Sequence, residues 1–335
     1  MSSEHSPIIV PELYQPFPSG LHPDAQALEE WWMAAVDHYQ LAATAAERTR
    51  IARTKWGIMS SRMYSTGPLE RVQVAVGLSA CISEADHQAI EGTAGRGDLP
   101  GVADHLLRWR LVIDDPDTQL DDAADGFDRY FQELCRRLHR LATPFQLLRM
   151  RASLADYALG AAADSVYIHA RRIPSLAQYR EIRKRTSFLH GFYFLLIEII
   201  AGYELPPATV TAPEFYALDF AAQDIVSIAN DILSCLKERH AGLGVNLPAA
   251  LARHHGYSLQ EAIDHAAALH RQRILDYESY AARFHTRSDE NLHHYMQAQR
   301  RFVQGIQDWY RETLRYHDPP QQTPVTTHFP PTSPA

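Results

Sequence analysis

The stretch AQDIVSIANDILSCLKE, residues 222–238, has the pattern of a buried helix with one polar face. Asn230, Ser234 and Glu238 recur every four residues, so on an α-helix their side chains lie within roughly 80° of one another. Apolar residues flank this face on both sides, which is unlike a polar stripe on a surface helix. An amide oxygen, a hydroxyl and a carboxylate are hard oxygen donors of the kind that Mg²⁺ takes. The stretch therefore predicts a helix that can hold a metal ion.

The composition of the chain fits one domain of about 300 residues with a tail at each end. The chain has 335 residues, of which 46% are hydrophobic, enough for one large core. Its net charge of −8 argues against a nucleic-acid partner, which would require a basic face. The start lacks a basic segment followed by an apolar run, and no stretch has about 18 apolar residues in succession. We therefore expect a cytoplasmic protein without stable membrane insertion.

The chain reads as helical between two proline-rich ends. Residues 1–22 contain few helix formers and predict an extended strap, and residues 317–335 predict a disordered tail. In between, helical patterns are interrupted only by Gly and Pro clusters, and no window favours a strand. Thr211 and Glu214 match a capping box at the start of the long helix with the polar face. We expect an all-α bundle of roughly ten to twelve helices.

Two basic segments lie at a distance from this helix. The run YREIRKRT, residues 179–186, leads directly into an apolar stretch, and Arg315-Tyr316 stands just before the proline-rich tail. A run of charges is usually a solvated helix face. However, the apolar stretch that follows residues 179–186 indicates a helix that enters the core.

The segment NDILSCLKE resembles the N-D-x-x-S-x-x-x-E metal motif of class I terpene synthases, in particular the microbial terpene cyclases. The resemblance covers about residues 20–316. It implies a single domain, residues 23–316, with the α-helical bundle of class I terpenoid synthases. It also implies that three Mg²⁺ ions and a linear prenyl diphosphate of sesqui- or diterpene size bind there. The enzyme would ionise this substrate and cyclise the carbocation to a hydrocarbon or an alcohol.

The resemblance also assigns roles to residues. The metal ligands implied are Asp86, Asn230, Ser234 and Glu238; the diphosphate contacts implied are Arg183, Lys184, Lys237, Arg315 and Tyr316; and the pocket residues implied are Phe188 and Trp309. Asn230, Ser234, Glu238, Arg315 and Tyr316 would be the catalytic set. Lys184 stands where the family has its diphosphate-sensing Arg, and Arg183 lies beside it. Either side chain could take that role, since Lys offers one compact charge where Arg offers a bidentate fork.

The acidic motif that the family carries on an earlier helix has two candidates here. Asp114-Asp115-Pro116-Asp117 is conspicuous, but Asp residues around a Pro favour a turn. The helical segment 70–92 offers Asp86 at a suitable distance from Asn230, with Glu91 as the only nearby substitute for a third acid. We expect Asp86 to be the principal carboxylate, with Asp114 and Asp115 as the alternative.

Two other functions remain open at this stage. One is an atypical prenyl-transferring enzyme of the same fold, although chain-elongating enzymes carry two Asp-rich helices. The other is a protein that binds a prenyl diphosphate without converting it, which the incomplete acidic motif would suit. Because antiparallel dimers are common in the family, a homodimer is a further expectation.

Overall fold

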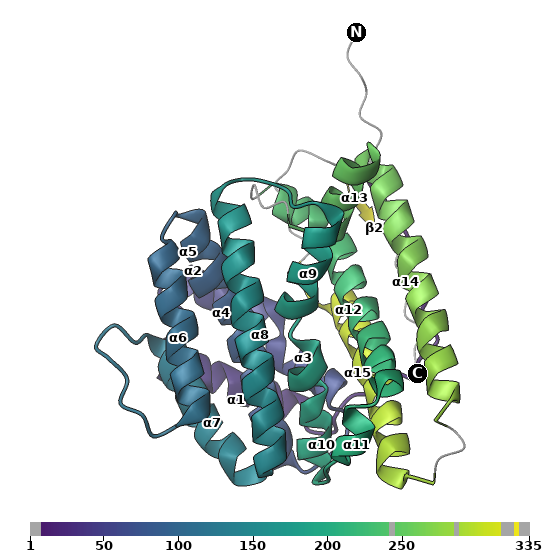
Figure 1. Cartoon of the computed structure of the whole chain (residues 1–335). Coiled ribbons are helices and arrows are strands. Elements are labelled where there is room, and N and C mark those ends of the chain that lie inside the picture. Colours follow the sequence, from purple (N-terminus) through teal and green to yellow (C-terminus); the bar gives the residue numbers. More distant parts are fainter. Residues whose placement is uncertain (1–7, 241–244, 285–287, 316–324, 328–335) are drawn as a thin grey trace.

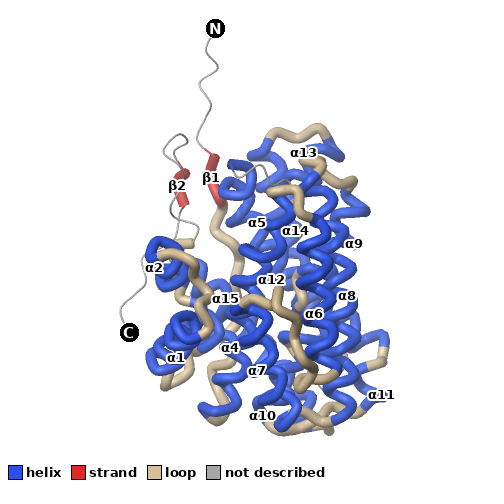
Figure 2. Tube along the Cα trace, turned by 90° about the vertical axis from the view of Figure 1, so that its left-hand side faces the viewer, coloured by secondary structure: helices blue, strands red, loops and turns tan. Residues whose placement is uncertain are grey.

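The fold is a bundle of helices that stand side by side, with almost no β structure (Figures 1 and 2). The computed structural model describes residues 8–240, 245–284, 288–315 and 325–327. The described helices are α1 Ala25–His38, α2 Ala45–Thr54, α3 Trp56–Met63, α4 Leu69–Ala85, α5 Gly92–Gly95, α6 Leu99–Asp114, α7 Gly126–Leu141, α8 Pro144–His169, α9 Leu176–Thr186, α10 Leu195–Ala201, α11 Pro207–Val210, α12 Pro213–His240, α13 Leu247–His255, α14 Leu259–Ala282 and α15 Glu290–Glu312, with π-helical turns η1 Asp86–Glu91 and η2 Leu189–Tyr193.

Local sequence explains where most of these helices begin. Five of the described helices begin with a capping box, in which the side chain of the N-cap residue accepts from the backbone N–H three residues later and the side chain of that later residue accepts from the backbone N–H of the N-cap residue. These boxes begin α2 at Thr44, α7 at Asp125, α8 at Thr143, α9 at Ser175 and α14 at Ser258. Many of the helices end within or beside the Gly and Pro clusters, whereas α1, α2 and α9 end where neither residue is present. The chain is therefore divided where local chemistry satisfies the exposed backbone groups of helix ends.

The predicted helical bundle is confirmed, and three details differ. Among the described residues the helices outnumber the expected ten to twelve, because short turns such as α5 and α11 form within the Gly and Pro clusters. Thr211 makes no capping box; its hydroxyl donates to the carbonyl of Pro207, 2.8 Å away, in α11. Strands were not expected, yet β1 Ile8–Val10 and β2 Val325–Thr327 pair in parallel. Pairing between segments so far apart has no local signal in the sequence.

The strap from residue 8 to residue 22 runs along α14 and α15. The backbone of Ile9 exchanges two hydrogen bonds, of 2.8 and 2.9 Å, with the side-chain amide of Gln260 on α14. Further along, the ring of Phe17 packs edge-on against Tyr277, and Ser19 donates to Asp308 on α15. Of the predicted disordered tail, only β2 lies within the described residues.

The segment between α9 and α10 is sharply kinked. Phe188 has a φ of 56° and Gly191 a φ of 75°, both in the left-handed region. The kink is held from α12, where Gln223 accepts from the backbone N–H of His190 and Asp219 bonds the His190 ring. The kink turns Phe188 toward the centre of the bundle, where its side chain is buried.

Aliphatic and aromatic side chains from α1, α3, α4, α7, α8, η2, α10, α12 and α15 form one large core. A smaller apolar cluster joins α12 to α13 and α14. Cys81, Cys135 and Cys235 are buried and free, as expected for small core residues. None of the described helices combines the length and the apolar character needed to cross a lipid bilayer.

Candidate active site

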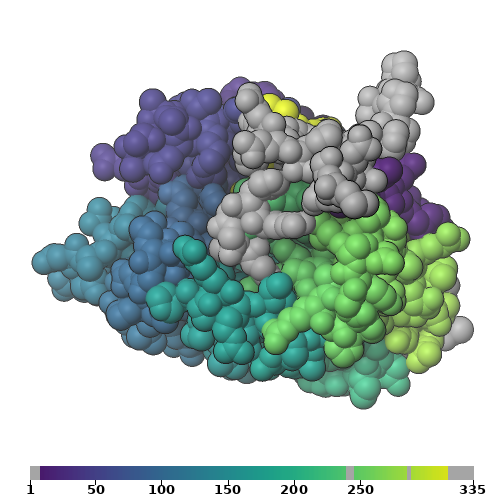
Figure 3. All heavy atoms as spheres, turned by 90° about the horizontal axis from the view of Figure 1, so that it is seen from above, coloured from purple at the N-terminus to yellow at the C-terminus, as the bar shows by residue number. Residues whose placement is uncertain are grey.

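A cavity of about 250 Å³ lies between α3, α4, η1, α8, α9, η2, α12 and α15. It is polar at the end formed by η1, the top of α8 and the C-terminal part of α12, and apolar elsewhere. Figure 3 views the molecule from above, where segments from the early (blue), middle (teal) and late (green) parts of the chain adjoin one another, and the lining residues come from these same parts. The cavity therefore collects residues that are far apart in the sequence.

The predicted polar face of α12 lines this cavity. Asn230, Ser234 and Glu238 all contribute to its wall. The side-chain amide of Asn246, at the start of α13, donates to the Glu238 carboxylate over 2.8 Å. Burial and the nearby charge of Asp231 raise the pKa of Glu238 to about 7. The oxygen atoms of these three side chains thus share one surface, with a carboxylate whose ionisation is opposed by its surroundings.

The π-helical turn η1 brings a second acidic group to the same cavity. In an α-helix, side chains five residues apart lie about 140° apart around the axis. The wider π turn, with its i→i+5 hydrogen bonds, reduces this angle, so that Asp86 and Glu91 both face the cavity. Burial, followed by the charge of Glu91, raises the pKa of Asp86 to about 7. Burial also opposes ionisation of Glu91, but the hydrogen bond and charge of His87 outweigh it and lower the Glu91 pKa.

Three cationic side chains face these acids. Arg183, Lys237 and Arg315 line the cavity. The Arg183 guanidinium donates to the amide oxygen of Asn230, 2.8 Å away, and forms an ion pair of 2.9 Å with Asp231. Burial and the charge of Arg315 lower the pKa of Lys237 to about 8. The cations therefore already touch, or lie near, the oxygen atoms that the sequence predicts as metal ligands.

The rest of the wall is aromatic and aliphatic. Phe188 stacks on Phe192 with ring centroids 4.1 Å apart, and Trp309 stacks on Trp56 at 5.3 Å. The indole N–H of Trp309 donates to the carbonyl of Thr54, which fixes the ring in the wall of the cavity. Other lining residues of this part are Met59, Met63, Ile82, Tyr157, Ile182, Leu189, Tyr193, Val226 and Ile306.

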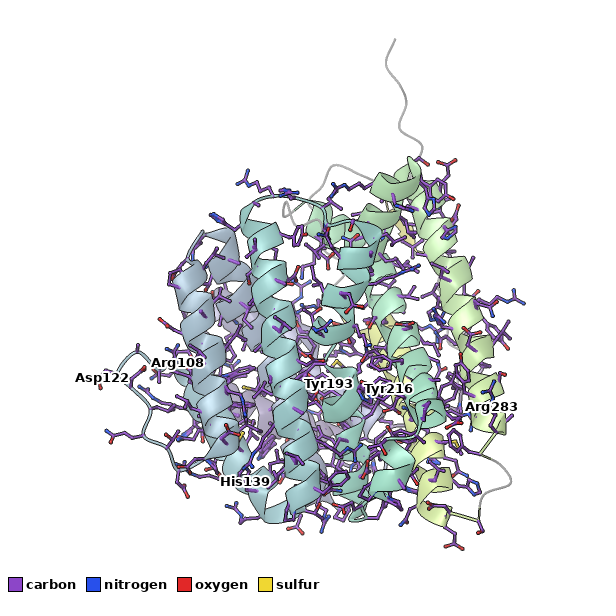
Figure 4. All side chains as sticks on the ribbon, viewed as in Figure 1. Arg108, Asp122, His139, Tyr193, Tyr216 and Arg283 are labelled. Atoms are coloured by element: carbon purple, nitrogen blue, oxygen red, sulfur yellow. The ribbon has the colours of Figure 1, made fainter. Side chains whose placement is uncertain are left out.

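Several residues predicted from the sequence lie elsewhere. Lys184 does not line the cavity; its ammonium lies 4.3 Å from the centroid of the Phe220 ring on the other side of α9. Asp114 and Asp115 are exposed at the end of α6, where Asp114 pairs with Arg110 and Arg151. The loop after them carries Asp122, which Figure 4 labels at the edge of the molecule, far from the cavity residue Tyr193. Tyr316 lies outside the described residues.

Among the polar cavity residues that the sequence analysis did not single out are Asp231, Tyr157 and Asp164. Asp231 is buried and accepts from the Tyr179 hydroxyl and from the backbone N–H of Leu247. Tyr157 on α8 donates to Asp86 over 2.6 Å. Asp164, also on α8, lines the cavity. Its sequence context, an Asp inside the alanine-rich stretch GAAADS away from any helix end, is a signal that could have identified it.

Comparison with known proteins identifies the family. Residues 88–276 match the family model described as terpene synthase family 2, C-terminal metal binding. The chain belongs to this family. The match contains the whole polar face of α12 and begins just after Asp86. The predictions of a microbial class I terpene synthase and of its all-α fold are thus confirmed.

The similarity to individual terpene synthases extends over most of the chain. Bonnadiene synthase from Allokutzneria albata is 27% identical over 90% of this chain and 83% of its own. The farnesyl-diphosphate-cyclizing corvol ether synthase of Kitasatospora setae is 25% identical, over 92% of this chain and 96% of its own. The crystal structure of linalool/nerolidol synthase from Streptomyces clavuligerus superimposes with a TM-score of 0.78 at 20% identity, covering 90% of this chain and all of that one.

A second acidic group lies away from the cavity of this terpene synthase. His105, Asp125 and Asp128 place ligand-type atoms within 4.8 Å of one another. The Asp128 carboxylate, however, accepts from Arg108 over 2.7 Å and closes the capping box of α7 with Asp125. These bonds are accounted for by the packing of α6 on α7, and none of the three residues lines the cavity.

The donor set of the cavity suits a divalent cation bound through oxygen. Carboxylates from η1 and α12 face the amide of Asn230 and the hydroxyl of Ser234, and no cysteine lines the space. Burial and, after it, repulsion from Glu91 raise the pKa of Asp86, and burial and repulsion from Asp231 raise that of Glu238. A bound cation would relieve this repulsion, and so Asp86, Glu91, Asn230, Ser234 and Glu238 fit the metal that the family description names.

We predict that the metal-free protein loses stability as pH rises from about 5 to 8. Because Glu238 and Asp86 keep their protons to higher pH when folded than when unfolded, the unfolded state binds fewer protons in this window, and stability falls as pH rises. Glu238→Gln should therefore match the wild type near pH 5 and melt about 2–4 °C higher at pH 8, measured by differential scanning fluorimetry in EDTA.

The control is Glu70→Gln, an exposed carboxylate on the first turn of α4. The difference in melting temperature between Glu70→Gln and the wild type should not grow with pH. A Glu238→Gln difference that is equal at pH 5 and pH 8 would contradict the electrostatic origin of the effect.

Proposed function

We propose that this terpene synthase ionises a linear prenyl diphosphate of sesqui- or diterpene size and cyclises the carbocation to a terpene hydrocarbon or alcohol. The observation that carries the proposal is the division of one cavity into two parts. Acids and cations meet at its polar end, while aromatic and aliphatic side chains form the remainder. An ionic head and a branched hydrocarbon chain require this combination.

At the polar end, Arg183, Lys237 and Arg315 hold the diphosphate, with Tyr316 as a further predicted contact. Asp86, Asn230, Ser234 and Glu238, together with Glu91, hold Mg²⁺, for which three ions remain our expectation. The metal supplies Lewis-acid stabilisation of the negative charge that develops on the diphosphate as its C–O bond breaks. The guanidinium of Arg183 now bonds Asn230 and Asp231, so binding of metal and diphosphate requires it to exchange the Asn230 oxygen for a phosphate oxygen.

In the apolar part, ring faces stabilise the carbocation and the walls exclude water. Phe188 and Trp309 line the cavity, and the π-electrons of such rings attract cations. Water would quench the cation, so a wall of buried aromatic and aliphatic side chains protects it. Substrate length is then set by the depth of this wall.

The first experiment is incubation with the C10, C15, C20 and C25 prenyl diphosphates and Mg²⁺, followed by gas chromatography of the extract. We expect cyclic products from farnesyl or geranylgeranyl diphosphate. Asn230→Ala removes a metal ligand and should reduce Mg²⁺-dependent turnover by at least about 100-fold. Full activity of this variant, or no product from any of the four substrates, would refute the proposal.

The second experiment separates the two neighbouring candidates for diphosphate recognition. Arg183 faces the cavity, whereas Lys184 lies over Phe220, so we assign the diphosphate contact to Arg183. Arg183→Lys keeps a charge opposite Asp231 but loses the bidentate fork. It should weaken binding of inorganic diphosphate in the presence of Mg²⁺ by about 10-fold or more, whereas Lys184→Ala should stay within about 2-fold of the wild type, by isothermal titration calorimetry. If Lys184→Ala weakened diphosphate binding more than Arg183→Lys did, the diphosphate contact would be assigned to Lys184 instead.

We also propose that two copies associate through α6 and α8. The outer face of α8 carries an exposed apolar stripe at alternating spacings of four and three residues, with two exposed leucines on adjacent α6. The stripe consists of Leu148, Ala152, Ala155, Leu159, Ala162 and Val166, and the α6 residues are Leu107 and Leu111. This spacing is that of a seam between two packed helices, and the same stripe on a second copy is its natural complement about a two-fold axis.

Sedimentation velocity tests this association. The wild type should sediment as a dimer at micromolar concentration, and Leu159→Lys, at the centre of the stripe, should be monomeric. Leu275→Lys is the matched control, because Leu275 is similarly exposed but lies on α14. A monomeric wild type, or a dimer that survives Leu159→Lys, would contradict the proposed interface.

A further inference from the structure

Asp164 is a cavity residue that belongs to none of the sequence motifs. It lies on α8, one of the long helices for which the sequence suggested no site residue. It lines the cavity, and its Oδ1 atom is closed off from solvent without a hydrogen-bond partner among the described residues. A buried carboxylate oxygen without a donor destabilises a protein. Its presence therefore points to a ligand that the protein itself does not provide.

The position of Asp164 on α8 relates it to the acidic turn η1. Tyr157 lies two turns earlier on the same face of α8 and donates to Asp86. The face that contacts Asp86 through a hydroxyl therefore also presents the Asp164 carboxylate to the cavity. Asp86, Glu91 and Asp164 all line the cavity, and burial, together with the charges of Glu91 and Asp86, raises the pKa of Asp164.

The turn η1 on its own provides few free carboxylate oxygens. Its residue after Asp86 is His87, whose ring lies 3.3 Å from the Glu91 carboxylate. Glu84, the acid before Asp86, is completely buried and does not line the cavity; Arg50, Trp56 and Gln88 donate to it. A single free carboxylate can hold one hydrated Mg²⁺, but bridging two metal ions requires more oxygen ligands.

We propose that Asp164 completes the acidic side of the metal site from α8, binding a divalent cation together with Asp86 and Glu91. The carboxylate that a denser acidic motif would carry on one helix is here contributed by a neighbouring helix. This inference rests on the proposed function, because it assumes that the cavity binds divalent metal with a diphosphate.

The test measures the binding of Mn²⁺ in the presence of inorganic diphosphate, and the electron paramagnetic resonance signal of free Mn²⁺ reports how much of the ion is bound. Asp164→Asn should weaken Mn²⁺ binding by about 10-fold or reduce the number of bound ions. Because the substitution removes one of several repelling carboxylates, its melting temperature in EDTA should be equal to or higher than that of the wild type. Asp164→Glu, which keeps the carboxylate, should retain more of the binding than Asp164→Asn.

Asp156→Asn is the matched control, since Asp156 lies on the same helix, has a side chain that is 61% exposed and pairs with Arg185 outside the cavity. It should bind Mn²⁺ like the wild type. If Asp164→Asn also binds like the wild type, while Asn230→Ala does not, the inference is wrong and the proposed function stands. A melting temperature lowered by Asp164→Asn without a change in Mn²⁺ binding would assign Asp164 a structural role and equally overturn it. If the wild type itself binds no Mn²⁺ with diphosphate, the proposed metal chemistry fails as well.

Discussion

The architecture depends on keeping several carboxylates in the wall of one cavity. Asp86, Glu91, Asp164, Asp231 and Glu238 line it from three separate helical segments, and burial raises the pKa of each of them except Glu91, whose pKa His87 lowers. The repulsion is partly offset by Arg183, which bonds oxygen atoms of Asn230 and Asp231. In the absence of ligands the positive charge of the Arg183 guanidinium lies beside Asn230 and Asp231 and partly neutralises the acidic side chains. The free energy stored in this arrangement becomes available when metal ions and an anionic substrate replace internal contacts.

This constraint explains why the surrounding structure is rigid. The acids face the same cavity only if α8, α12 and η1 each keep a fixed orientation about the helix axis. Asp219, buried on α12, fixes one of these relations by accepting from Tyr295 and Gln299 on α15 and by bonding the His190 ring. Asn246 fixes the position of α12 relative to α13, since its side chain donates to Glu238 and also caps the start of α13. The polar network outside the cavity thus determines the positions of the groups inside it.

The sequence allowed the fold, the polar face of α12 and a minority of the residues that line the cavity to be predicted. Asn230, Ser234 and Glu238 could be placed because helical periodicity alone determines which residues share a face. The choice between Arg183 and Lys184 could not be made, because adjacent residues point about 100° apart and the rotation of α9 depends on tertiary packing. In the acidic turn η1 the sequence singled out Asp86 but gave Glu91 only as a substitute. A π turn has no sequence signature, and an α-helical register would place Asp86 and Glu91 on different faces. Asp164 escaped because its partners lie on other helices, so no spacing within α8 reveals them.

The pairing of β1 with β2 has a practical consequence for building fusions of this enzyme. Ile8 lies opposite Val325 and Val10 opposite Thr327, so two segments that are more than three hundred residues apart in the sequence pair at one place. The same strand β1 is held to α14 by Gln260. A second enzyme joined to either end would be tethered at nearly the same point. A circularly permuted chain, with its natural ends linked and new ends opened in the exposed loop between α6 and α7, would leave the cavity walls intact and relocate the attachment point to the opposite end of the bundle.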